Sequence, residues 1–234
     1  MSWIFTPVIA GVSAYFVFRS IYRFILATDD PRQAAHRWLP IYVFITLLVT
    51  LLVSILQGLQ PLGFRFSVWP TVFYSSIFCG VLAFLSGKFF QNKNGEKVKN
   101  DPFHFKYVER SFGLLTVFTA CSMAFAHGSN DVANAIGPLA AIVDILVFQH
   151  ELTHQAAIPI WVVALGSFGV VSGLAMYGYK IMETVGNGIT QLTPSRGFTA
   201  QFSTSAIIVV ASGLGYPVST TQTMVGAILG VGLA

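Results

Sequence analysis

The chain has 234 residues, of which 54% are hydrophobic and only 9% charged, and its mean hydropathy is +0.70. Soluble domains carry about 25% charged residues, so this chain cannot cover a water-facing surface of its own size, and a soluble globular fold is excluded. The net charge of +4 lies in short segments between apolar runs, which argues against nucleic acid as a partner. We therefore predict an all-α membrane protein with spans of roughly 20 residues each.

Three predicted transmembrane spans occupy residues 1–90. They cover residues 3–26, 40–59 and 70–90, and polar segments separate them. Residues 91–110 form the longest polar stretch and are predicted to be a loop. This first part of the chain is therefore expected to be a set of three simple membrane crossings.

The basic residues orient these spans. They flank the first and third loops, as Arg19, Arg23, Arg32, Arg37, Lys88, Lys93, Lys97, Lys99, Lys106 and Arg110. The second loop carries Arg65 alone, and the loop after residue 148 carries none. Because cytoplasmic loops are enriched in Lys and Arg, the first loop and residues 91–110 are predicted to be cytoplasmic and the N-terminus to lie outside.

A fourth apolar run begins near Ser111 and is interrupted by AHGSNDVANAIGP, residues 126–138. An acid at membrane depth costs roughly 2.5–3.5 kcal/mol and is a functional hypothesis by default. Asn130 and Asn134 lie one helical turn apart, with Asp131 beside them. These three residues are predicted to bind a ligand; the alternative is that they only hold neighbouring helices together.

The backbone is expected to break just before this group, at Gly128 and Ser129. A broken helix exposes unpaired N–H groups and a positive dipole end, which bind anions. Asp131 could cap that end or coordinate a cation. His127 fits either a functional role or an ordinary hydrogen bond between spans.

A fifth span is predicted over residues 158–179, and a second polar cluster follows in GLGYPVSTTQTMVGAILGVG, residues 213–232. Its hydrogen-bonding side chains are consecutive: Ser219, Thr220, Thr221, Gln222 and Thr223. With Pro217 just upstream, they predict a helix start that either cradles an oxyanion or acts as a cap without a ligand. Residues 199–234 are predicted to form a re-entrant hairpin, which is tolerated at membrane depth where it lines a cavity.

Three stretches are similar to the inorganic phosphate transporter family, the PiT-type symporters, and within it to bacterial low-affinity phosphate transporters. They are AFAHGSNDVANAIGPLAAI, TVGNGITQLTPSRGF and YPVSTTQTMVGAILGVG. The match is strong over residues 108–234 and rests on layout alone before that. The resemblance implies two inverted repeats, each with an NDxxN-type element and a Ser-Thr-Thr hairpin, and phosphate and coupling cations bound between them.

Residue roles follow from this resemblance. The substrate-binding residues would be Asn130, Asp131, Asn134, Ser219, Thr220 and Thr221. The coupling-ion residues would be Asp131, Asn134, Gln222 and Thr223. Many members of the family have His where this chain has Gln222, which cannot titrate, so a proton relay at that position is excluded.

The chain contains one NDxxN element, whereas the resemblance implies two. We therefore expect half of an inverted-repeat transporter: a polytopic helical bundle with a broken helix and a re-entrant hairpin. Residues 111–234 would form the C-terminal repeat, truncated at its end, and an N-terminal repeat of the same transporter would be missing.

The expected function is secondary active transport of inorganic phosphate across the inner or plasma membrane, coupled to H⁺ or Na⁺. No catalytic residue, resident metal or cofactor is expected. Phosphate could enter as a metal–phosphate complex, and a homodimer is a further alternative. Two alternatives are a transporter of another tetrahedral oxyanion and a non-transporting membrane fragment. A third is an intramembrane enzyme that uses Asp131 and His127 as acid and base, but the chain has no suitably spaced nucleophile for it.

Overall fold

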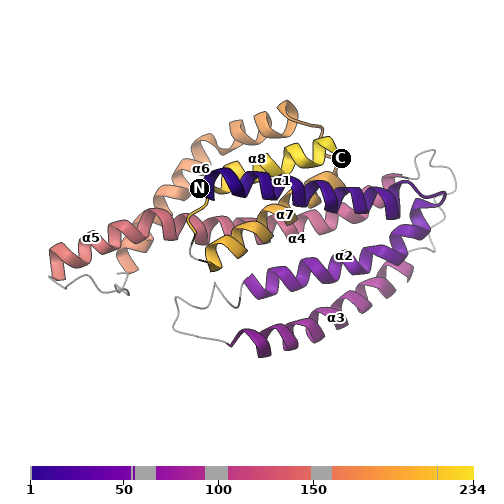
Figure 1. Ribbon diagram of the computed structural model, residues 1–234, viewed down its shortest axis with the longest axis horizontal. Helices are drawn as coiled ribbons and strands as arrows, with labels where there is room; N and C mark the ends of the chain where they lie inside the picture. The colour runs from indigo at the N-terminus through magenta and orange to yellow at the C-terminus, as the bar shows by residue number, and fades with distance from the viewer. Residues whose placement is uncertain (1, 54, 56–66, 93–104, 149–159, 215) are drawn as a thin grey trace.

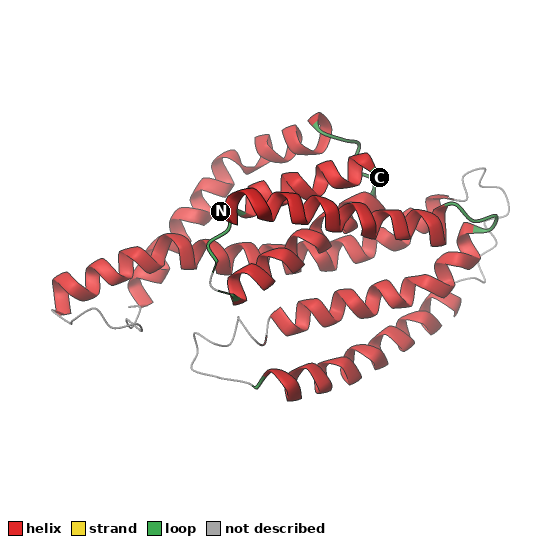
Figure 2. Ribbon diagram, viewed as in Figure 1, coloured by secondary structure: helices red, strands yellow, loops and turns green. Residues whose placement is uncertain are grey.

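The computed structural model describes residues 2–53, 55, 67–92, 105–148, 160–214 and 216–234. Every element in these ranges is a helix (Figure 2). The elements are α1 (Ser2–Ile21), the π-helix η1 (Tyr22–Leu26), α2 (Pro31–Val53), α3 (Val68–Asn92), α4 (Phe105–Asp131), the π-helix η5 (Val132–Ile136), α5 (Gly137–Phe148), α6 (Ile160–Gly188), α7 (Pro194–Gly213) and α8 (Thr220–Leu233).

Within these ranges, five helices are long and apolar enough to cross a membrane. They are Trp3–Leu26, Pro31–Leu52, Trp69–Ser86, Val108–Gly128 and Ile160–Thr184. Their outward faces carry large apolar side chains such as Phe16, Phe73 and Leu174, each more than half exposed. In water such surfaces would be unstable, so the prediction of an all-α, multi-pass membrane protein is confirmed.

The second span begins earlier than predicted, at Pro31 rather than Pro40. Asp30 caps the helix, because its Oδ1 accepts hydrogen bonds from the backbone N–H groups of Arg32 and Gln33, both at 3.1 Å. An acidic cap followed by Pro at the first helical position is a strong start signal. The polar segment around it is therefore the first two turns of α2, not a loop.

Other boundaries also differ. The helix α4 begins at Phe105, inside the segment predicted to be a loop, and α6 continues to Gly188, beyond the predicted end at residue 179. A helix that extends beyond the hydrocarbon core can carry polar residues, so apolar runs mark the membrane-embedded part and not the helix ends. The predicted loop at residues 149–157 lies outside the described residues.

The helical hairpin of α7 and α8 is held between α1 on one side and α4 on the other (Figure 1). The α1–α8 crossing is close because it uses glycine. A Cβ atom built on Gly226 would overlap the carbonyl oxygen of Pro7, and one on Gly230 would overlap that of Gly11. In a bilayer, small residues at such crossings allow the backbone contact that drives helix association.

Aromatic side chains fill the junction of α2, α4 and α7. The rings of Phe112 and Phe198 have centroids 5.5 Å apart, and Tyr42 meets both edge-on at 6.2 and 6.3 Å. Phe112 and Phe198 are almost completely buried. Pairs in these geometries are worth about 0.5–1.5 kcal/mol beyond their area, so the cluster fixes the start of α7 against α4.

Basic residues gather near one set of helix ends. The end of α1, the start of α2, the end of α3 and the starts of α4 and α7 all lie toward the right of Figure 1. Described basic residues at this end include Arg19, Arg23, Arg32, Arg110 and Arg196. The start of α1 and the start of α8 lie toward the opposite end. The cytoplasmic location of the basic end stays a prediction from the positive charges.

Candidate functional site

The polar interruption of the fourth span takes a different form from the predicted break. The α4 helix continues through Gly128 and Ser129 to Asp131, whose φ of −71° and ψ of −35° are helical. The next five residues are π-helical, and α5 follows at Gly137. No helix N-terminus therefore opens before Asp131, and the expectation of free N–H groups there is wrong. A π segment inserts extra backbone into a helix and is frequent at functional sites.

The two asparagines of the motif reach the α7–α8 hairpin at one backbone atom. The Nδ2 group of Asn130 donates to the carbonyl oxygen of Val218 at 3.0 Å, and that of Asn134 donates to the same oxygen at 3.3 Å. Asn130 is buried and Asn134 is exposed. These contacts join residues 84 and more positions apart in the sequence, so the two polar stretches do meet, as expected.

The carboxylate of Asp131 contacts two side chains of its own helix. The Nε2 atom of His127 lies 2.7 Å from Oδ2 of Asp131, and Nδ2 of Asn130 donates to Oδ1 of Asp131 at 3.2 Å. The histidine and the aspartate are four residues apart, a spacing that brings side chains together on a helix. Both are partly exposed, so the carboxylate lies at an accessible surface next to the hairpin.

The hydroxyl cluster marks the start of α8. Ser219 is its N-cap, with φ −91° and ψ 111°, and its Oγ accepts from the N–H of Gln222 at 3.4 Å. The hydroxyl of Thr223 donates to the carbonyl oxygen of Ser219 at 2.8 Å. Thr220 and Thr223 are buried, whereas Thr221 and Gln222 are exposed. The predicted helix start is therefore present, with Ser219 and Thr221 as its more accessible hydroxyls.

This arrangement combines two chemistries. The start of α8 carries the positive end of a helix dipole, which favours an anion. Asp131 and the amide oxygen of Asn134 are hard oxygen groups of the kind that bind cations. Because Val218 immediately precedes the N-cap, the asparagine contacts place the acidic segment beside the helix start.

Sequence reasoning missed the contact that positions the start of this hairpin. Glu109 on α4 caps the start of α7: its Oε2 accepts from the backbone N–H of Ser195 at 2.9 Å, and its Oε1 accepts from the Ser195 hydroxyl at 2.7 Å. Thr116 adds a bond to the carbonyl oxygen of Pro194 at 2.9 Å. The Pro-Ser pair at the start of α7 resembles a helix N-terminus, but a cap supplied from a distant helix leaves no local signal.

The carbonyl of Val218 was also missed, because a backbone acceptor has no side-chain signature. Its role follows from the amide donors that converge on it. By contrast, the four-residue spacing of His127 and Asp131 is visible in the sequence and could have predicted their contact.

The model of the phosphate transporter family matches residues 1–234, the whole of this chain. The chain belongs to that family. A relative from Haemophilus influenzae, named "Putative phosphate permease", is 46% identical over 233 residues, which cover 100% of this chain and 55% of the relative. The "Inorganic phosphate transporter 2-1, chloroplastic" of Arabidopsis thaliana is 36% identical over 260 residues and is covered to 43%. The chain thus spans about half the length of the curated relatives it matches.

A solved structure is also similar. The protein titled "The sodium-dependent phosphate transporter" superposes with a TM-score of 0.82 and 32% identity. The superposition covers 100% of this chain and 56% of that protein. The helical arrangement of Figure 1 is therefore that of a member of the phosphate transporter family.

Proposed function

We propose that this chain is one portion of a secondary active transporter that carries inorganic phosphate across the inner or plasma membrane. The observation that carries the proposal is the convergence of Asn130 and Asn134 on Val218, beside the start of α8. Membership of the phosphate transporter family supports phosphate as the substrate. Since the chain spans about half the length of its relatives, the remainder of the site would come from a second repeat.

Phosphate is proposed to bind at the start of α8, through the accessible hydroxyls of Ser219 and Thr221 together with the Asn130–Asn134 segment. Thr220, which the sequence also indicated, is buried and would contribute through the helix start that it helps to form. Hydroxyls suit phosphate because they donate to charged oxygens and accept from a protonated one. The oxygen of Ser219 accepts from the backbone, which leaves its O–H to donate to a ligand. No Lys or Arg lies between residues 197 and 234, so the helix dipole and a bound cation would compensate the charge.

The coupling cation is proposed to bind at Asp131 and Asn134, close to the phosphate. The donation from Asn134 Nδ2 to Val218 leaves its amide oxygen as the group for a cation. Gln222 is exposed and is retained as a proposed ligand. Thr223 is buried and would contribute by holding the backbone of Ser219. The similar protein is titled sodium-dependent, which favours Na⁺ over H⁺.

Uptake of radiolabelled phosphate into transport-deficient cells tests the proposal, with this chain in its full-length parent. Asp131→Asn should abolish uptake and its Na⁺ dependence while membrane insertion is retained. Normal uptake by that variant would make the acid structural. Uptake driven by a pH gradient without Na⁺ would assign coupling to H⁺, and equal competition by sulfate would broaden the substrate to tetrahedral oxyanions.

The hydroxyls are tested separately. Ser219→Ala should raise the phosphate concentration for half-maximal uptake on the order of tenfold to a hundredfold, because a hydrogen bond to a charged group contributes roughly 1.5–3 kcal/mol. Ser172→Ala is the matched control, since that hydroxyl donates to the carbonyl of Phe168 on the exposed α6 helix. Equal, small effects of both changes would reduce Ser219 to a helix cap.

A further inference from the structure

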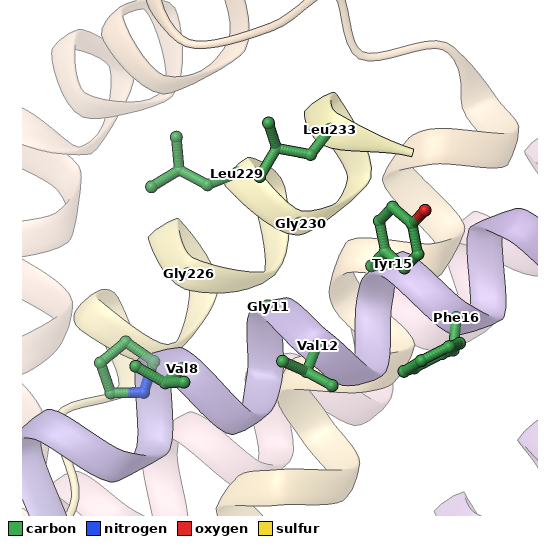
Figure 3. A pocket seen from close by; sticks show the side chains of 10 residues that line it. Val8, Gly11, Val12, Tyr15, Phe16, Gly226, Leu229, Gly230 and Leu233 are labelled. Carbon is green, nitrogen blue, oxygen red and sulfur yellow. The ribbon is translucent and has the colours of Figure 1, made fainter.

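An apolar groove of about 650 Å³ runs along the outer side of the α1–α8 crossing (Figure 3). Its α1 wall consists of Pro7, Val8, Val12, Tyr15 and Phe16, and its α8 wall of Leu229 and Leu233. The volume is within the range of roughly 300–1,000 Å³ that is typical of small-molecule sites. Almost all of the lining is hydrocarbon, so an occupant must itself be apolar over this length.

Three glycines form the base of the groove, where the two helices touch. Gly11, Gly226 and Gly230 line it, and in Figure 3 they lie between the flanking side chains. A Cβ on Gly230 would overlap the backbone of Gly11, so a larger residue there is excluded by the crossing itself. The two helices therefore meet backbone to backbone at the base of the groove, and the larger side chains of α1 and α8 form its walls.

Two basic residues lie beyond one end of the groove, Arg19 in the last turn of α1 and Arg23 in the π-helix η1 that follows. Arg19 follows Tyr15 by four residues and Phe16 by three, so it lies on the groove side of the helix. Its Nη1 donates to the carbonyl oxygen of Ala234 at 3.4 Å, next to Leu233 at the end of the α8 wall. Arg23 lies four residues further on, and both arginines are exposed.

The spacing fits one leaflet of a bilayer. From Val8 to Arg19 the helix rises about 16 Å at 1.5 Å per residue, and half of the hydrocarbon core is about 15 Å. An acyl chain in the groove would therefore place its headgroup level with the arginines. These lie at the basic end of the protein, where the positive charges predict the cytoplasmic surface.

We propose that this groove binds one anionic phospholipid of the cytoplasmic leaflet. One acyl chain lies between Val12 and Leu229, over the glycines of the crossing, and the lipid phosphate binds Arg19 and Arg23. The two arginines select an anionic headgroup over a zwitterionic one, and the apolar walls exclude free inorganic phosphate. This site is on the outer face of α1 and α8 and is separate from the proposed transport site.

Photo-crosslinking of the full chain in nanodiscs tests the proposal. A photoreactive amino acid replaces Val12 in the groove or, as the control, Val81 on α3, which is exposed to a nearly equal degree (52% and 54%). The nanodiscs contain phosphatidylcholine with a minority of phosphatidylglycerol, and mass spectrometry identifies the adducts. At Val12 the adducts should be enriched severalfold in phosphatidylglycerol relative to the bulk mixture, whereas at Val81 they should match it.

The double change Arg19→Gln and Arg23→Gln should remove the enrichment at Val12 and leave the labelling at Val81 unchanged. Bulk-like lipid adducts at Val12 in the unaltered chain would overturn the proposal, as would adducts to a second copy of the chain or to another polypeptide. Because the comparison of Val12 with Val81 needs neither arginine variant, failure of a variant to fold does not affect the result.

Discussion

The helices α4 and α6 are both long and apolar, but they differ in burial. In the membrane-spanning part of α4, 39% of the residues are buried within the chain, whereas in that part of α6 only 6% of the residues are buried. Lipid is as apolar as Leu, so hydrophobicity gives neither helix a reason to pack against another. Polar bonds between segments distinguish the two helices instead. The α4 helix bonds to α7 through Glu109 and Thr119 and to the turn before α8 through Asn130. In contrast, Ser172 and Thr184 of α6 bond to their own helix.

Glycines also differ between a packed and an exposed helix. The largest loss of stability is expected from a substitution at the α1–α8 crossing. Gly230→Ala adds a Cβ that would overlap the backbone of Gly11, and overpacking costs about 1–3 kcal/mol or more. Gly173→Ala on α6 meets nothing within 4 Å and should stabilise the helix slightly. Thermal unfolding of the purified protein in detergent compares the two changes.

A large loss of thermal stability is expected for Gly230→Ala alone. If both variants melted like the unaltered chain, the crossing would be more adaptable than its geometry indicates. An equal loss at Gly173 would mean that α6 packs against protein along its exposed face.

The next largest loss of stability is expected at the start of α7. Glu109→Ala removes both acceptors from Ser195, and loss of an N-cap costs about 0.5–2 kcal/mol. Glu183→Ala on the exposed side of α6 should change stability little. Thiol labelling of a cysteine at Ser205, which is buried on α7, should accelerate with Glu109→Ala and not with Glu183→Ala. Equal labelling rates would contradict the capping role.

The smallest effect is the difference between the two asparagines, of which one is a buried and the other an exposed donor to the same carbonyl oxygen. Asn130→Ala should cost about 1–2 kcal/mol, within the range for a lost buried hydrogen bond. Asn134→Ala should cost less, because its bond is longer and its side chain is exposed. Denaturant unfolding measures the difference, and a larger loss from Asn134→Ala would reverse the assignment of the anchoring residue.

The sequence allowed the spans and the meeting of the two polar stretches to be predicted, since both depend on residue type and spacing. Trp3–Leu26 was placed at the observed bounds, and the four-residue spacing of Asn130 and Asn134 correctly suggested a shared face. The start of α2 was misplaced because Asp30 and Pro31 were interpreted as a polar loop and not as a cap.

The rest could not be predicted, for two physical reasons. A π segment such as Val132–Ile136 has the composition of an ordinary helix, so its residue types do not mark it in the sequence. The contacts of Glu109 with Ser195 and of Asn130 with Val218 depend on the tertiary fold. The roles assigned to the site residues remain predictions.

The run from α4 through η5 to α5 has a consequence for the thickness of the membrane. Residues 105–148 form continuous helix, roughly 66 Å long at 1.5 Å per residue, against a hydrocarbon core of about 30 Å. Even a tilt of about 40°, the upper end of the usual range, leaves more than a third of the rod outside the core. A helix run of this length therefore cannot lie within the hydrocarbon core from end to end, and the polar residues of Phe105–Arg110 at its start fit a position outside that core.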